Sequence, residues 1–270
     1  MSNYDSNPLH AYPPNQPRNG VGKLTLLLIG INVALFVLQV LSGVDFSDPS
    51  TRDAMHWGAD YAPLTYLSEP YRLFSSMFFH FGFMHLLMNM WALFVFGNIA
   101  EQVFGRAYYL GLYILAGLMG NLLSGYLDIL NSYAYLQHPA QDLIPRVSAG
   151  ASGAVMGLGG ALTALSFFRN VPYLDRKSLL IIMIANVGFG FFASGINNMA
   201  HIGGIIMGVI LALGWHFTQK MYAGKIMPMI VLGLGVALCF VFYQYNQQQI
   251  QGLLALWQDA ASQMKTLLIN

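Results

Sequence analysis

Long stretches without any charge are the feature that most limits what this chain can fold into. Only 9% of the 270 residues are charged, 56% are hydrophobic, and the mean hydropathy is +0.53. Seven apolar windows contain none of the charged side chains, and each is close to the ~20 residues that cross a bilayer as a helix. The windows are residues 24–43, 80–100, 107–127, 150–168, 178–195, 198–218 and 226–243.

These windows predict an all-α fold, a polytopic membrane helical bundle. Backbone amides have no water partner in hydrocarbon, so a spanning segment forms a helix or joins a closed barrel, and strand alternation is absent. We expect a disordered tail over residues 1–23, a six-span core over 24–218, and a loop with a seventh span over 219–243. Residues 244–270 repeat apolar side chains at helical spacing, which predicts an amphipathic helix lying on the membrane surface. The first loop, residues 44–79, carries aromatic side chains and is expected to be partly embedded in the membrane.

The distribution of Lys and Arg predicts the orientation. With seven spans, eight of these residues fall on the side of the N-terminus and four on the other side. The positive-inside rule then predicts a multi-pass protein of the cell membrane with a cytoplasmic N-terminus and an external C-terminus.

Charge and cysteine content exclude several functions. A net charge of +1 gives no basic surface for neutralising phosphates, so we expect no nucleic acid partner. The single cysteine, Cys239, excludes disulfides within the chain and thiolate metal clusters. No His-Glu-x-x-His motif is present, so we expect no metal and no cofactor. The sequence gives no indication of an oligomeric state.

Polar side chains inside spans are energetically costly, and here they share a depth. In the predicted topology the second, fourth and sixth spans all run from outside to inside. Each has its reactive groups near its beginning, which are His80, His85 and Asn89, then Ser152, then His201.

The surroundings of Ser152 and His201 are glycine-rich. Gly153 with Gly157, and Gly204 with Gly208, form small-xxx-small pairs that let two helices approach closely in lipid. A serine on one helix could then meet a histidine on the other, with the amides of a helix N-terminus ready for a developing oxyanion. This combination is typical of acyl transfer chemistry.

Taken together, these motifs resemble those of the rhomboid intramembrane serine proteases. The resemblance covers six spans in order, and the seventh fits the version of the family with one extra C-terminal helix. It rests on His80, His85 and Asn89, on Gly150 to Gly153, on Ala200, His201, Gly204 and Gly208, on Tyr71-Arg72, and on Glu101 with Gly105.

The resemblance implies a role for each matching position. Ser152 would be the nucleophile and His201 the general base, without a third acid. His85, Asn89 and the Ser152 amide would form the oxyanion hole, and His80 would be structural. Arg72 and Glu101 would hold the first loop. Met156 departs from the tyrosine that often stacks on the catalytic histidine in this family.

The expected activity is cleavage of transmembrane segments of other membrane proteins, within the lipid bilayer and near its outer face. One alternative is an inactive pseudoprotease of the same fold that binds such segments without cutting them. Another is a transporter that uses His and Asn side chains as an ion relay, although no inverted repeat supports it.

Overall fold

The computed structural model describes residues 20–171, 173, 175–192, 197–220, 224 and 226–269, without the side chains of residues 189–192. These residues form helices and no strand apart from one isolated bridge. Residues 1–19 of the predicted tail lie outside the described residues. The helices are α1 (Lys23–Leu41), α2 (Thr51–His56), α3 (Ala62–Leu67), α4 (Arg72–Ser75), η1 (Ser76–Phe78), α5 (Phe83–Ala92), η2 (Leu93–Gly97), α6 (Asn98–Phe104), α7 (Arg106–Gln137), η3 (Gln141–Leu143), α8 (Ser152–Leu165), α9 (Arg176–Phe192), α10 (Asn198–Lys220), α11 (Ile226–Gln249), η4 (Ile250–Leu253) and α12 (Leu254–Ile269).

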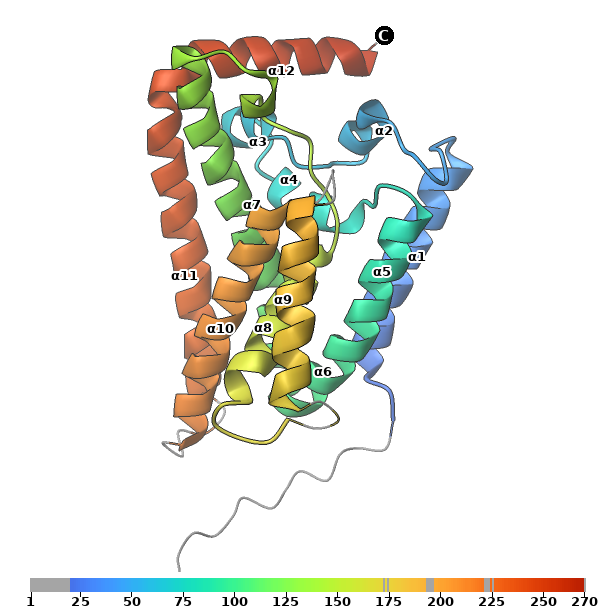
Figure 1. The fold of residues 1–270 in the computed structure, drawn as a ribbon, viewed down its shortest axis with the longest axis vertical. Helices are drawn as coiled ribbons and strands as arrows, with labels where there is room; N and C mark the ends of the chain where they lie inside the picture. Colours follow the sequence, from blue (N-terminus) through green and yellow to red (C-terminus); the bar gives the residue numbers. More distant parts are fainter. Residues whose placement is uncertain are drawn as a thin grey trace, which may run out of the picture.

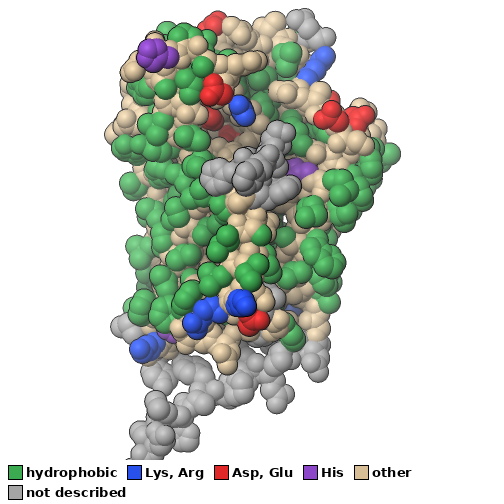
Figure 2. All heavy atoms as spheres, in the orientation of Figure 1, with side chains coloured by type: hydrophobic (Ala, Val, Ile, Leu, Met, Phe, Trp, Pro, Cys, Tyr) green, Lys and Arg blue, Asp and Glu red, His purple; other side chains and the backbone are tan. Residues whose placement is uncertain are grey.

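The helices form an upright bundle with one helix lying across its end (Figure 1). Five helical segments of the described chain are long and apolar enough to cross a membrane: α1, the continuous run Phe83–Phe104, α7, α10, and α11 with the segment that follows it. Hydrophobic side chains cover the middle of the face seen in Figure 2, and charged ones gather toward its two ends. The chain is therefore a multi-pass membrane protein, as its composition predicted.

The helices that correspond to the other two windows are shorter. Helix α8 has 14 residues, a length of about 21 Å, and helix α9 has 17. Nearly all of α8 is buried among other helices, so it lies inside the bundle and not at its lipid surface. The predicted seven spans stay a prediction for these two segments.

Two predicted boundaries were wrong. Helix α7 continues to Gln137, ten residues beyond the predicted window, and its outer turns pack against the C-terminal segment. The second window starts too early, because helix α5 begins at Phe83 and His80 precedes it. Gly82, between them, has φ 84°, and a Cβ there would collide with the carbonyl of Ser47. Only glycine fits this conformation without strain, so the chain turns here before the helix starts.

Helix α12 differs from the surface helix that we expected. It lies across the end of the bundle occupied by α2 and α3 (Figure 1). Its apolar side of Trp257, Ala261, Met264 and Leu268 packs on protein, in clusters with Met55, Tyr61, Leu64 and Tyr66 from the first loop. The amphipathic pattern was correct, but the apolar face is covered by the protein's own loop and not by lipid.

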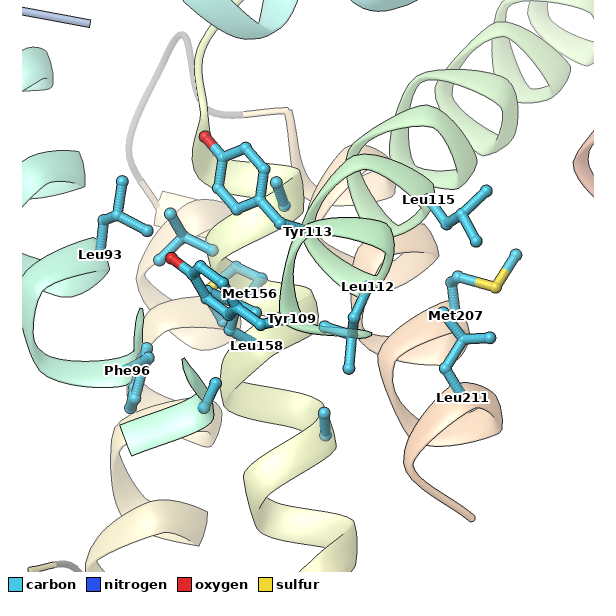
Figure 3. Close-up of a cluster of buried hydrophobic side chains, with 14 of the residues drawn as sticks. Leu93, Phe96, Tyr109, Leu112, Tyr113, Leu115, Met156, Leu158, Met207 and Leu211 are labelled. Atoms are coloured by element: carbon cyan, nitrogen blue, oxygen red, sulfur yellow. The ribbon is translucent and has the colours of Figure 1, made fainter. Parts of the chain in front are cut away.

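One large cluster of buried side chains holds the bundle together. Figure 3 shows part of this cluster, with Leu93 and Phe96 from η2, Tyr109 and Leu112 from α7, and Leu211 from α10. Helix α8 runs through it. The central position of α8 fixes the depth at which its first residue, Ser152, lies in the molecule.

Candidate active site

Ser152 is the first residue of α8, and the segment that leads into it is fixed to the first loop. Ser148 and Asp60 exchange two backbone hydrogen bonds of 2.8 and 2.9 Å. The amide of Gly150 donates to the carbonyl of Ser76 at 2.8 Å. Three backbone bonds within three residues therefore hold the start of α8 in place. Sequence analysis missed Asp60 and Ser148, because an isolated bridge has no periodic pattern.

Two histidines lie beside this segment. His80 is fully buried, and its Nε2 accepts a long hydrogen bond of 3.4 Å from the amide of Ala151. The Nδ1 of His85 accepts from the amide of Phe81 at 3.2 Å. A neutral His85 ring therefore has its proton on Nε2. Its ring lies against Gly150, where a Cβ would be only 2.8 Å from the His85 Cε1. The Nε2 atom of His85, which would carry the proton, thus faces the segment that ends at Ser152.

Asn89 lies one helical turn after His85 on α5, as its i+4 spacing predicted. It is buried, and its amide nitrogen donates to the carbonyl of His85 at 2.9 Å. An Asn amide nitrogen has two hydrogens, so one remains for another acceptor.

His201 lies in the first turn of α10, and the residue before this helix holds that turn. The Asn197 side chain accepts from the amide of Ala200 at 3.1 Å and donates to the hydroxyl of Ser124 on α7 at 2.6 Å. This is the bond that an N-cap residue makes. His201 is buried, and its Nδ1 has no hydrogen-bond partner among the described residues. An Asn directly before an apolar helix is a signal that could have identified Asn197 from sequence.

Helices α8 and α10 touch at the glycines that the sequence singled out. A Cβ at Gly204 would meet the carbonyl oxygen of Gly153, and one at Gly208 would meet that of Gly157. A Cβ at Gly153 would lie 3.2 Å from the carbonyl oxygen of Ala200. Residues 153 and 200 are the chain neighbours of Ser152 and His201. The helix ends that carry the predicted nucleophile and base therefore lie side by side.

His85, from the second predicted span, also lies beside the start of α8. Its ring centroid is 5.2 Å from that of His80, in an edge-to-face arrangement. The His85 ring lies against Gly150, and the backbone of Ala200 lies against Gly153, so the elements that carry His85 and His201 both contact the start of α8. The structure thus gathers His80, His85 and His201 around the start of α8.

Arg72 forms hydrogen bonds with three residues of the first loop. Its guanidinium is 4% exposed and donates to the carbonyls of Met55 and Ala59, both at 2.9 Å, and to the carboxylate of Glu69 at 2.7 Å. These bonds connect the end of α2 to the start of α4.

Glu101 has a different partner from the one predicted. Its carboxylate accepts from the amides of Leu24 and Thr25 at 3.2 and 2.8 Å, and from the Thr25 hydroxyl at 3.0 Å. It therefore caps the first turn of α1, where unpaired amides favour a negative charge. Arg106 donates to the same carboxylate at 3.4 Å, and among the described residues no hydrogen bond joins Glu101 to the first loop. The sequence placed Glu101 at a helix end but gave no information about which helix it contacts.

Burial raises the pKa of Asp60, in the first loop, to about 6. The hydroxyl of Thr65, which donates to this carboxyl at 2.5 Å, and the charge of Arg72 oppose the effect.

Met156 is buried in the main core, as Figure 3 shows. It lies one turn after Ser152. Helix α8 contains no aromatic residue, so no ring from this helix can stack on His201.

Comparison with known proteins agrees with this architecture. The family model of the Rhomboid domain matches residues 67–220. The Rhomboid protease GluP of Bacillus subtilis (strain 168) is 29% identical over 261 residues, which cover 94% of this chain and 48% of that protein. The Rhomboid protease AarA of Providencia stuartii is 29% identical over 211 residues, covering 73% of each chain. The Putative rhomboid protease YdcA of B. subtilis is 32% identical over 146 residues, covering 53% of this chain and 66% of that protein.

The fold and the match define a helical membrane protein built around a Rhomboid domain. Because the match covers more than half of the chain, the protein belongs to the rhomboid family. It spans about half the length of its relative GluP.

Proposed function

We propose that this protein is an intramembrane serine endopeptidase that cleaves transmembrane segments of other membrane proteins. The observation that carries the proposal is the glycine contact between α8 and α10, which supports a meeting of Ser152 with His201. Similarity to several rhomboid proteases supports the same reaction class.

In the proposed reaction His201 takes the proton of the Ser152 hydroxyl as the oxygen attacks the carbonyl carbon of a peptide bond. The negative charge that develops on the carbonyl oxygen would be stabilised by the Ser152 amide, the His85 Nε2 proton and the free amide hydrogen of Asn89. His201 then gives its proton to the leaving amine, and an acyl-enzyme remains. Water, activated by the same imidazole, hydrolyses that ester and regenerates the serine.

The substrate must expose a peptide carbonyl to this site. A transmembrane helix keeps its amides internally hydrogen-bonded, so it must unwind locally before the serine can attack. Small or helix-weakening residues near the cut should therefore be favoured. We further propose a location in the cell membrane, with the N-terminus cytoplasmic, the C-terminus external and the site near the outer face. The excess of Lys and Arg on the side of the N-terminus supports this orientation.

A serine-reactive fluorophosphonate tests the proposal. Purified wild type should be labelled at Ser152, whereas Ser152→Ala and His201→Ala should not. Ser262→Ala on α12 and His138→Ala at the end of α7 are matched controls at exposed positions and should label like wild type. Equal labelling of all five proteins would contradict a Ser152–His201 dyad.

Co-expression with single-span membrane proteins then tests the substrate class. Release of their outer domains should occur with wild type and stop with Ser152→Ala. If folded wild type neither labels nor cleaves, the pseudoprotease alternative is favoured.

A further inference from the structure

A pocket of about 690 Å³ lies at the end of α8 remote from Ser152, where the chain turns into α9. Its lining combines three cations with an apolar strip. The cations are Arg169, Arg176 and Lys177, with Asp175 as the single carboxylate. Figure 2 shows Lys and Arg side chains gathered at the lower end of the visible face, directly below the hydrophobic band.

The positive charge of this pocket is largely unbalanced. Asp175 accepts from the amide and the hydroxyl of Ser178, at 2.8 and 3.1 Å, and so caps the start of α9. Among the described residues, none of the three cations forms an ion pair. Three cations and one carboxylate give the lining an excess of positive charge.

The three cations have different roles. Arg176 donates two hydrogen bonds to the carbonyl of Ser166, at 2.9 and 3.1 Å, and lies over the Phe167 ring. It thus shapes the pocket by joining the end of α8 to the start of α9. Arg169 is exposed and lies over the ring of Trp215, and Lys177 is exposed. Arg169 and Lys177 are therefore the two cations free to meet a ligand.

The apolar part of the lining continues from the cations along α9. Lys177, Ile181 and Ile184 follow at i, i+4 and i+7, so they lie on one helix face. Ile181 and Ile184 are 55% and 69% exposed. A charged group followed by an exposed apolar strip along one helix matches an amphiphile whose head is anionic and whose tail is apolar.

We propose that this pocket binds an anionic phospholipid, with Arg169 and Lys177 contacting the headgroup phosphate and an acyl chain lying along Ile181 and Ile184. A free phosphate ion would use the cations only and would leave the apolar strip without a function. The proposal does not depend on the proposed protease activity, because it concerns the opposite end of α8.

Native mass spectrometry of the full chain in detergent tests the proposal. Phosphatidylglycerol and phosphatidylcholine with the same acyl chains are titrated separately, and bound lipid is counted. Wild type should retain one phosphatidylglycerol far better than phosphatidylcholine. Arg169→Gln with Lys177→Gln should lower its affinity for phosphatidylglycerol on the order of tenfold, because both proposed phosphate contacts are removed.

A matched variant separates a built site from general attraction. Lys23→Gln with Lys220→Gln removes the same charge from exposed positions outside the pocket and should change binding less than about twofold. Equal losses in the two double variants would overturn the proposal, as would equal binding of the two lipids. Displacement of phosphatidylglycerol by millimolar inorganic phosphate would also overturn it in favour of a phosphate ion site. Each variant must keep the unfolding temperature of wild type.

Discussion

The contact between α8 and α10 and the packing of the C-terminal segment, residues 246–269, on α7 and the first loop hold their parts together in opposite ways. In the first, backbone meets backbone at Gly153, Gly157, Gly204 and Gly208, without bulky side chains between the helices. In the second, side chains form the contact. Trp257 is fully buried and its indole nitrogen donates to the Ser132 hydroxyl at 2.9 Å, while Asn246 donates to the Tyr66 hydroxyl at 2.7 Å.

The difference predicts different tolerance to change. A backbone contact cannot adjust by rotating a side chain, so added volume must separate the helices. Where side-chain hydrogen bonds form the contact, a single substitution removes one bond and leaves the others in place. Variants in the first region should therefore have large effects on the whole protein, and variants in the second should have graded, local ones.

The largest effect is expected for Gly208→Ala. The new methyl would collide with the carbonyl group of Gly157, so the free energy of unfolding should fall by about 3 kcal/mol. Thermal unfolding in detergent measures the change. Gly233→Ala on α11 is the control, because a Cβ there meets nothing within 4 Å. Similar unfolding temperatures for both variants would show that the contact is not tight.

The charge of Asp60 should make the first loop sensitive to pH. Its folded pKa of about 6 is above the unfolded value, so its contribution to stability is present at pH 4 and is lost as pH rises through 6. Unfolding temperatures measured from pH 4.5 to 7.5 should therefore decline up to about pH 6.5 and then level off, by an amount that corresponds to about 2 kcal/mol.

Asp60→Asn keeps the size of the side chain and removes its charge, so this decline should disappear and the variant should be more stable than wild type at pH 7. Asp48→Asn, in an exposed part of the same loop, should leave the decline unchanged. A wild-type profile that rises with pH would contradict the sign of the effect.

A smaller effect is expected for Trp257→Phe. The aromatic ring is kept and the bond to Ser132 is lost, so the free energy of unfolding should fall by about 1 kcal/mol. A double-mutant cycle with Ser132→Ala measures the coupling, which should be of that size. Simple additivity of the two variants would mean that this bond contributes nothing.

The smallest effect is expected for Lys265→Ala. Its nitrogen is 4.0 Å from the Glu69 carboxylate, and its side chain is 51% exposed. Solvent screens such a pair, so stability should change by less than about 0.5 kcal/mol, and raising the salt concentration should remove the difference. A loss as large as that of Trp257→Phe would show that charge holds α12 in place.

The sequence predicted the features that depend on local pattern. Uncharged windows gave the helical membrane class, and the glycine spacing at Gly153/Gly157 and Gly204/Gly208 indicated where two helices touch. The position of Ser152 at a helix start was also readable, because the small residues begin there.

The features that the sequence did not predict depend on contacts between residues distant in the chain. His80 was assigned to a helix because no charge interrupts the window, but Gly82 turns the chain before α5 begins. The amphipathic pattern of α12 showed that one face is buried without showing that the first loop covers it. The partner of Glu101 and the pairing of Asp60 with Ser148 were unreadable for the same reason. No local pattern in the sequence identified the distant partners of these groups.

The shortness of α8 has a consequence for any reaction that begins at its first residue. At about 21 Å it falls some 9 Å short of a hydrocarbon layer of about 30 Å. A bond hydrolysed there yields a new carboxylate and a new ammonium group, and neither is stable at that depth. These charges would favour movement of both new chain ends toward water.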